Sequence, residues 1–310
     1  MRSSTVSDGV TFAVAAVALV ALLAVGVASP GLVFDTSPDV GGNAHGAGRP
    51  VPDIACPAFA TRAGVEARVT TWTVRPGESF EAWAFGATIP GPTLCAQNNA
   101  SFVLTVINSL PAAFTPRVGG LEPLEGPWPT LAPGERAART FAIPAEGGVF
   151  PYVAVEEEAR LAGLYGVIVA RAPDVGPIDR EYVMVLSEFD SEALAGRFHA
   201  ALGGHTYPWA PLLTADVGDR VLIHLVNLGF EDHTFHVHGH RWHDPHDGRP
   251  IDNKYLKPLG EEGAALVSAT SFVIVAAEPG DWMYHCHIYD HINGGMTGVF
   301  RVGEGGVHHV

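Results

Sequence analysis

Lysine is nearly absent from this chain of 310 residues, which contains only Lys254 and Lys257. The formal net charge of −15 therefore comes more from scarce lysine than from abundant acid. We expect no nucleic-acid partner, because the chain offers little that would neutralise a phosphate backbone. The acidity indicates solubility and a preference for cationic partners or substrates, and nothing more specific.

Cysteine is also scarce, with three residues in the chain. Cys286 lies in a histidine-rich stretch, which leaves Cys56 and Cys95 as a candidate pair. An exported protein could oxidise that pair. Separation in sequence gives no geometry, however, so a disulfide and two buried thiols are equally good predictions.

One uncharged apolar run lies near the N-terminus, from Val10 to Ala28. It predicts that residues 1–28 are a signal peptide or a membrane anchor. Either places the rest of the chain in the exported compartment: extracellular, periplasmic or on the outer face of the cytoplasmic membrane. Residues 29–53 are rich in glycine, proline and aspartate without periodicity, which predicts a flexible linker.

No long helical pattern follows. Short runs rich in β-branched and aromatic residues alternate with proline and glycine, for example "ASFVLTVIN", "YGVIVAR", "RVLIHLVN" and "TGVFRV". This pattern predicts an all-β chain of sandwich or barrel type.

The β-rich region repeats. One segment aligns without a gap when Asn108 is set on Asn227, and a second when Tyr152 is set on Tyr284. The repeat predicts two copies of one β-domain, at about 54–174 and 178–303, followed by a tail at 304–310.

Histidine is absent from most of the first copy. Of fifteen histidines only His45, in the predicted linker, precedes residue 199. The second copy gathers them as "DHTFHVHGHRWH" and "HCHIYDH".

One of these clusters offers soft ligands from a single loop. Cys286, His291 and Met296 have the spacing C-x4-H-x4-M on a predicted strand, turn and strand. A thiolate, an imidazole and a weak thioether are three of the four ligands of a blue-copper site, and His233 from a distant strand can supply the fourth. The alternative is a cysteine and methionine buried in the core, over which the joint spacing favours copper.

Two His-x-His pairs accompany this set, His236 with His238 and His285 with His287. Residues two apart share a face of a strand, so the second pair points away from the side chain of Cys286. Two such pairs facing each other would form half of a multinuclear copper cage. Cys286 would then join its own copper to the cage through the histidines beside it.

These motifs resemble a known family. "HTFHVHGHRW", "IDNK" and "DWMYHCHIYDHINGGMTGVF" resemble the C-terminal copper-binding segments of multicopper oxidases, especially the two-domain small laccases of bacteria. "IPGPTL" and "GLYGVIV" in the first copy resemble the same family, so the resemblance covers about residues 54–303. It implies two Greek-key sandwiches of the cupredoxin type, copper as cofactor and a homotrimer.

The resemblance also implies roles. The type 1 copper, which takes electrons from the reductant, would be held by His233, Cys286, His291 and Met296. The type 2 copper would use His236, and the type 3 pair would use His238, His285 and His287. Other histidines of the second copy are expected at the surface, behind the ligands or in structural positions: His224, His240, His243 and His246.

The first copy lacks every matching ligand. Opposite the two His-x-His pairs lie Arg117, Gly119, Val153 and Val155. Opposite the type 1 set lie Phe114, Ala154, Ala159 and Leu164. Valine and glycine cannot coordinate a metal, and a permanently charged arginine repels one. Four histidines cannot hold three copper ions in the way that four-electron reduction of dioxygen requires.

The favoured hypothesis is an exported copper redox protein with an intact type 1 site and a residual half-site, acting in electron transfer or as a weak oxidase. No catalytic residue beyond the metal ligands is predicted, and the donor and acceptor are not identified. One alternative is a working laccase-type oxidase, completed by His199, His205 or a partner chain. Others are nitrite-reductase-like chemistry at a type 2 copper on His238 and His285, and copper storage, which a tuned Cys–Met site disfavours.

Overall fold

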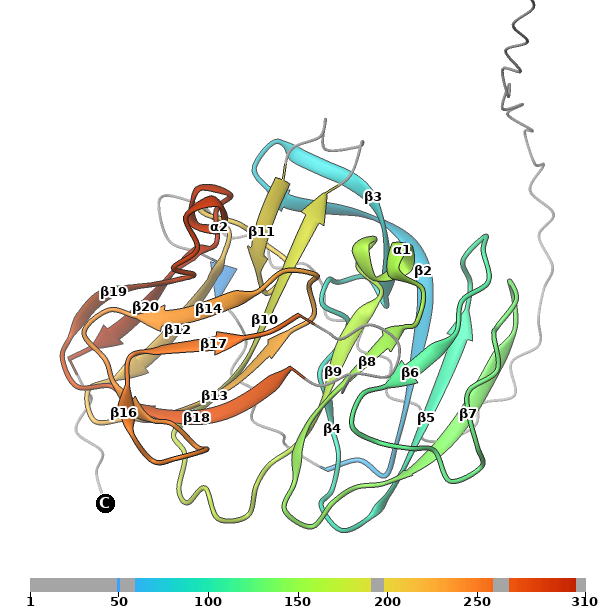
Figure 1. Ribbon diagram of the computed structural model, residues 1–310, viewed down its shortest axis with the longest axis horizontal. Coiled ribbons are helices and arrows are strands. Elements are labelled where there is room, and N and C mark those ends of the chain that lie inside the picture. The colour runs from blue at the N-terminus through green and yellow to red at the C-terminus, as the bar shows by residue number, and fades with distance from the viewer. Residues whose placement is uncertain (1–48, 51–58, 191–197, 259–267, 305–310) are drawn as a thin grey trace, which may run out of the picture. The chain divides into compact units, whose positions relative to one another are not determined.

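The regular secondary structure consists almost entirely of β-strands. The computed structural model describes residues 49–50, 59–190, 198–258 and 268–304, all within one compact unit of the chain (Figure 1). In these ranges the helices are two single turns, α1 (Glu157–Leu161) and α2 (Tyr289–Asn293). The prediction of an all-β chain is confirmed. None of the described helices is long and apolar enough to span a membrane.

The first half contains two four-stranded sheets, in the orders β3-β2-β5-β7 and β4-β9-β8-β6. The strands of the first sheet are β2 (Arg62–Arg75), β3 (Glu78–Phe85), β5 (Ser101–Asn108) and β7 (Arg136–Ala142). Those of the second are β4 (Leu94–Cys95), β6 (Pro116–Val118), β8 (Gly148–Ala154) and β9 (Tyr165–Ala170). In β5 every second side chain is buried, the alternation expected of a strand with one face on a core.

The second half repeats this plan, with sheets in the orders β11-β10-β13-β18 and β1-β12-β20-β19-β14-β17. The first of these contains β10 (Arg180–Asp190), β11 (Phe198–Leu202), β13 (Arg220–Asn227) and β18 (Ala269–Val275). The other contains β1 (Arg49–Pro50), β12 (Pro211–Asp216), β14 (His233–Val237), β17 (Asn253–Leu256), β19 (Gly280–His285) and β20 (Thr297–Gly303). A separate two-stranded sheet joins β15 (Trp242–His243) to β16 (Pro250–Ile251).

The predicted leader lies outside the described residues, as does all of the predicted tail except residue 304. Of the predicted linker, only Arg49 and Pro50 are described, and they pair with β12 as the strand β1. Cys95 is disulfide-bonded, while its candidate partner Cys56 lies outside the described residues.

The two halves use the same local contacts at the positions aligned by sequence. The side chain of Asn108 donates to the carbonyls of two later loops and accepts from the N–H two residues on. Asn227 makes the same set of bonds. Tyr152 and Tyr284 each donate a hydroxyl to a proline carbonyl. These repeated hydrogen bonds hold equivalent loops in place in both halves.

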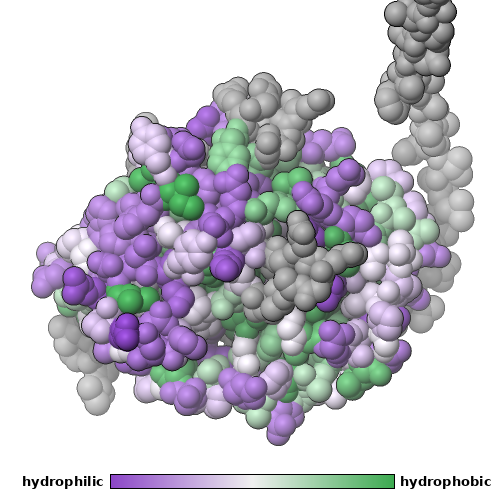
Figure 2. All heavy atoms as spheres, in the orientation of Figure 1, coloured by the Kyte–Doolittle hydropathy of each residue, from purple (hydrophilic) through white to green (hydrophobic). Residues whose placement is uncertain are grey.

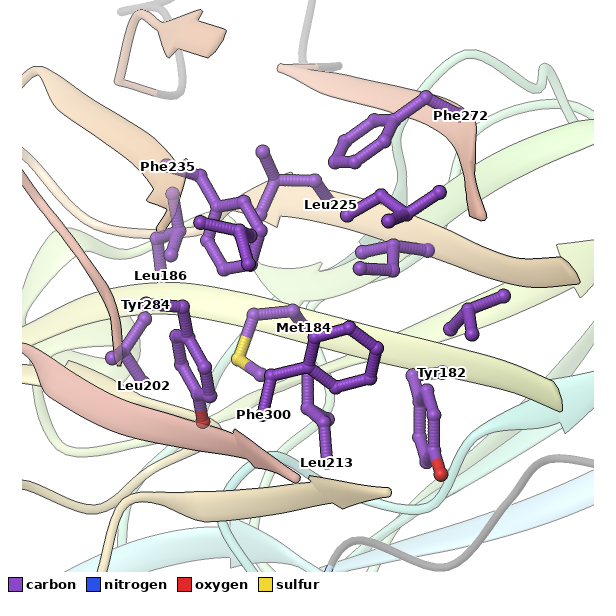
Figure 3. Close-up of a cluster of buried hydrophobic side chains, with 14 of the residues drawn as sticks. Tyr182, Met184, Leu186, Leu202, Leu213, Leu225, Phe235, Phe272, Tyr284 and Phe300 are labelled. Carbon is purple, nitrogen blue, oxygen red and sulfur yellow. The ribbon is translucent and has the colours of Figure 1, made fainter. Parts of the chain in front are cut away.

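Three hydrophobic clusters fill the described residues. One lies inside the first half and one inside the second; Figure 3 shows the latter, in which Phe235, Tyr284 and Phe300 point toward side chains of β10 such as Met184. The third joins the halves and packs Val153 with Val226 among others. Strands β10 and β13 contribute side chains to the cluster inside the second half and also to the cluster between the halves, so both faces of these strands are buried. The surface of the second half that is seen on the left of Figure 2 is mostly hydrophilic.

Candidate metal centre

The predicted type 1 residues come from two segments, the strand β14 and the connection between β19 and β20. His233 is the first residue of β14, and Cys286 directly follows β19. His291 lies on α2, where the sequence predicted a turn, and Met296 immediately precedes β20. All four residues are buried, with at most 1% of their surface exposed.

The donor atoms of His233, Cys286 and His291 converge. His233 Nδ1 lies 3.0 Å from His291 Nδ1, and Cys286 Sγ lies 3.6 Å from the same atom of His291. The backbone N–H of Cys286 donates to Met296 and that of Met296 donates to His291, which holds the loop closed. Two imidazoles, a thiolate and a thioether form a donor set that suits copper.

The sulfur is held as a thiolate. Burial raises the pKa of Cys286, but hydrogen bonds from His233 and His291 outweigh it and lower the pKa to about 5. Burial lowers the pKa of His233, but its bonds to Cys286 and Glu188 raise it to about 9. Thr234 adds its backbone N–H, 3.4 Å from the sulfur. The thiolate form is the one that binds metals.

Each of these two histidines has a carboxylate at its outer nitrogen. His233 Nε2 contacts the buried Glu188. His291 Nε2 lies 2.7 Å from Glu231, whose side chain is 55% exposed. Sequence reasoning did not identify either acid. An acid inside the apolar run "EYVMVLSEF" was the available signal for Glu188, since acids are rarely buried without a partner.

The four cage histidines also come together. His236 pairs with His285 across β14 and β19, and their ligand atoms gather with that of His287 within 4.8 Å of one another. His238 Nε2 lies 3.2 Å from His285 Nε2.

Backbone carbonyls orient two of these rings. His236 Nδ1 lies 2.6 Å from the Asp252 carbonyl, and His285 Nδ1 lies 2.8 Å from that of Cys286. A carbonyl can only accept, so each Nδ1 donates and each Nε2 keeps its lone pair. The pKa of His285 is lowered, first by burial and then by the other cage histidines, which favours the neutral, metal-binding form.

The remaining histidines that the sequence singled out lie in other contacts. His224 bonds Ser271 and Glu181, as a structural histidine would. His199 pairs with Glu78 of the first half, and His205 bonds the Thr73 carbonyl. Those two contacts join the halves, and neither residue belongs to a donor group found among the described residues.

The other three lie in the segment after β14. His240 is buried and bonds the His238 carbonyl behind the cage. His243 bonds the Gly248 carbonyl at an exposed site, and His246 is also exposed.

The first half carries the same backbone without the donors. Arg117 pairs with Val153 across β6 and β8, in the register in which His236 pairs with His285. Gly119 and Val155 bond the neighbouring strands through their backbone N–H groups. The positions equivalent to the type 1 set are all buried apolar residues: Phe114, Ala154, Ala159 and Leu164. At these eight described positions the first half therefore has no histidine, cysteine or methionine side chain.

Comparisons with known proteins agree with this architecture. Residues 66–174 and 183–306 each match a multicopper oxidase family. A probable nitrite reductase–hydroxylamine oxidoreductase fusion protein from Kuenenia stuttgartiensis is 29% identical over 277 residues, which cover 78% of this chain and 31% of that protein. Human ceruloplasmin is 30% identical over 116 residues, 36% of this chain and 10% of its own length. This chain thus spans a third or less of these relatives.

Solved structures show the same fold. The blue copper oxidase from Nitrosomonas europaea aligns with a TM-score of 0.68 at 18% identity, covering 80% of this chain and 87% of that chain. The copper nitrite reductase from the same organism aligns with a TM-score of 0.67 at 20% identity, covering 78% and 93%. The expectation of cupredoxin-type sandwiches is confirmed. With both halves matched, this chain belongs to the multicopper oxidase family, whose members bind copper.

Proposed function

We propose that this chain is a copper redox protein that holds one type 1 copper in its second half. The observation that carries the proposal is the convergence of two imidazole nitrogens and a buried thiolate at one point, with Met296 beside them. Copper bound there would supply one-electron redox chemistry.

The protein's own residues prepare that site in three ways. Thr234 and the two histidines hold the sulfur as a thiolate. The backbone bonds between Cys286, His291 and Met296 fix the loop that carries three of the ligands. Burial of all four side chains excludes water from the metal. A site organised in this way needs little rearrangement when its metal changes charge.

The histidine cage is the second part of the proposal. His236, His285 and His287 offer three imidazoles, enough for a single additional metal ion. The two sites are connected through the chain, because Cys286 lies between His285 and His287 in sequence. Without ligands from the first half, dioxygen reduction would be weak or absent, and the main activity would be electron transfer.

A spectrum of the copper-loaded full chain tests the type 1 assignment. We expect an intense visible band from the bond between copper and the Cys286 thiolate. Cys286→Ser should abolish it, because a hydroxyl cannot replace the thiolate. Arg136→Gln, at an exposed position on β7 of the first half, serves as a control and should keep the band. A Cys286→Ser protein that is still blue would contradict the proposal.

A second candidate function is one-electron reduction of nitrite to nitric oxide, with two protons taken up and water released. It is supported by the likeness over 78% of this chain to a probable nitrite reductase fusion protein. It also fits the three-histidine group, which could hold one catalytic copper. Nitric oxide formation from nitrite by the reduced copper protein would favour this candidate, and its loss in His236→Ala would locate it at the cage.

The cellular setting remains part of the proposal. We propose that the chain acts in the exported compartment, with a redox donor and acceptor of unidentified chemistry and as a homotrimer. The net charge of −15 supports a cationic donor. Size-exclusion chromatography with light scattering would test the trimer directly.

A further inference from the structure

Among the described residues, Glu188 is the buried acid that touches a type 1 residue. It lies in β10 with 5% of its surface exposed, and its Oε1 contacts His233 Nε2. A buried carboxylate costs free energy unless it is well bonded. We therefore expect Glu188 to have a specific role at this position.

The loop before β14 is built to receive this carboxylate. The backbone N–H of Phe230 donates to Glu188 Oε2 over 2.8 Å, and that of Glu231 donates to Oε1 over 3.3 Å. A Cβ added at Gly229 would overlap the carboxylate, so the glycine leaves it room. One acid thus fixes both the loop leading to His233 and the ring of His233 itself.

The first half shows what this position contains when there is no ligand. Asn108 pairs with Ala67, as Asn227 pairs with Leu186, so Glu188 is equivalent to Val69. By the same alignment the equivalents of Gly229 and His233 are Leu110 and Phe114. Histidine, acid and glycine therefore occur together in the second half and are replaced together in the first.

We propose that Glu188 is a positioning residue for the type 1 copper. It accepts the proton on His233 Nε2, which leaves Nδ1 directed at Cys286 and His291, and it places an unscreened negative charge next to one ligand. This inference rests on the proposed function. Its consequence for the metal is that Cu(II) is stabilised relative to Cu(I), because the additional negative charge favours the more positive ion.

Glu188→Gln in the full chain removes the charge and keeps the size. We expect the protein to stay blue, with the ratio of Cu(I) to Cu(II) binding constants raised about tenfold, a potential shift of ~59 mV for one electron. Gly229→Ala should shift the potential in the same direction by displacing the carboxylate. Glu231→Gln is the matched control: it makes the same change at His291, but in water, and should shift the ratio less than about threefold.

A second readout does not need copper. In proton–nitrogen correlation spectra of the metal-free chain, the His233 Nε2 proton should lie far downfield and move upfield in Glu188→Gln. A folded Glu188→Gln protein with the wild-type potential, or an Nε2 proton that does not move, overturns this inference. A wild-type chain without a blue band refutes the proposed function instead, and the metal-free spectra then decide the role of Glu188 alone.

Discussion

Within the described residues, the two halves of this molecule share one fold, and the second brings together candidate type 1 copper ligands where the first has apolar residues. In the first half the N–H of Ala154 donates to the Leu164 carbonyl over 3.1 Å, and in the second that of Cys286 donates to Met296 over 3.2 Å. Both loops contain a five-residue helix with one buried side chain, Ala159 on α1 and His291 on α2. Cupredoxin geometry therefore does not depend on copper.

A metal site costs free energy because it buries charged and polar side chains, and the two halves differ in this respect. The first half fills its four equivalent positions with phenylalanine, alanine and leucine, which pack without desolvating a charge. The second half buries a thiolate, two imidazoles and a carboxylate, and satisfies them with hydrogen bonds and with the ion pair between His233 and Glu188. The first half shows that the same strands and loops form around apolar side chains at these positions.

The comparison is tested most severely by transferring the four type 1 ligands from the second half to the first. In a Cys286→Ser background, the first half can be given four ligands by Phe114→His, Ala154→Cys, Ala159→His and Leu164→Met. Because the loop bonds are the same, we expect a thiolate–copper band to return, measured by visible absorption after copper addition. The same variant with Ala154→Ser is the control. A folded, copper-treated protein without a band would show that the first half cannot place the four ligands as the second half does.

Restoring a cage histidine in the first half should instead destabilise the protein. Val153 is 2% exposed and packs in the cluster between the halves with Val185 and Val226. Val153→His would overfill that cluster and bury a polar ring, at a cost of about 3 kcal/mol in the free energy of unfolding. Val155→His, at a half-buried position, is the control and should cost under about 1 kcal/mol. Urea denaturation measures both, and equal costs would contradict the packing.

The contributions of Cys286 and His233 to the stability of the metal-free protein should together be greatest between about pH 6.5 and 8.5. The pKa of Cys286 is lowered to about 5 and that of His233 raised to about 9, from unfolded values near 8.5 and 6.5. From pH 6.5 down to 5, the unfolded chain holds the cysteine proton that the folded one lacks, so about 2 kcal/mol of stability is lost. In the plateau the two differences cancel, and above pH 8.5 the His233 contribution is lost.

Denaturation of the metal-free chain at a series of pH values measures this profile. Cys286→Ala removes the thiolate and with it the additional support for a charged His233, so its profile should lack the steep fall below pH 6.5. The same slope in both proteins would mean that other groups cause it.

Met296→Leu should have the smallest effect. Leucine occupies the equivalent position in the first half, fully buried, so the substitution should change the free energy of unfolding by less than about 1.5 kcal/mol. The protein should stay blue, and its reduction potential should rise because a weak thioether donor is lost. Voltammetry gives the result; a potential that falls or stays fixed would remove Met296 from the ligand set.

The sequence predicted the β-rich architecture, and the histidines that it grouped with Cys286 lie close together in two donor groups. It could do so because Asn108 with Asn227 and Tyr152 with Tyr284 are anchors that repeat in both halves. It missed α2, because a single helical turn is too short for a periodic pattern. It missed Glu188 because that acid reaches His233 from a strand 45 residues earlier in the chain. Contacts of that range depend on how the strands pair.

Copper content per chain, measured by elemental analysis on the fully loaded protein, tests the central claim most directly. If only the second half holds redox copper, the protein should bind about one copper ion per chain. It should bind at most two when the group of His236, His285 and His287 also holds an ion. Oxygen uptake with a reducing donor should then stay far below that of a laccase. Four copper ions per chain, with brisk oxygen consumption, would contradict the account and mean that other ligands complete the cluster.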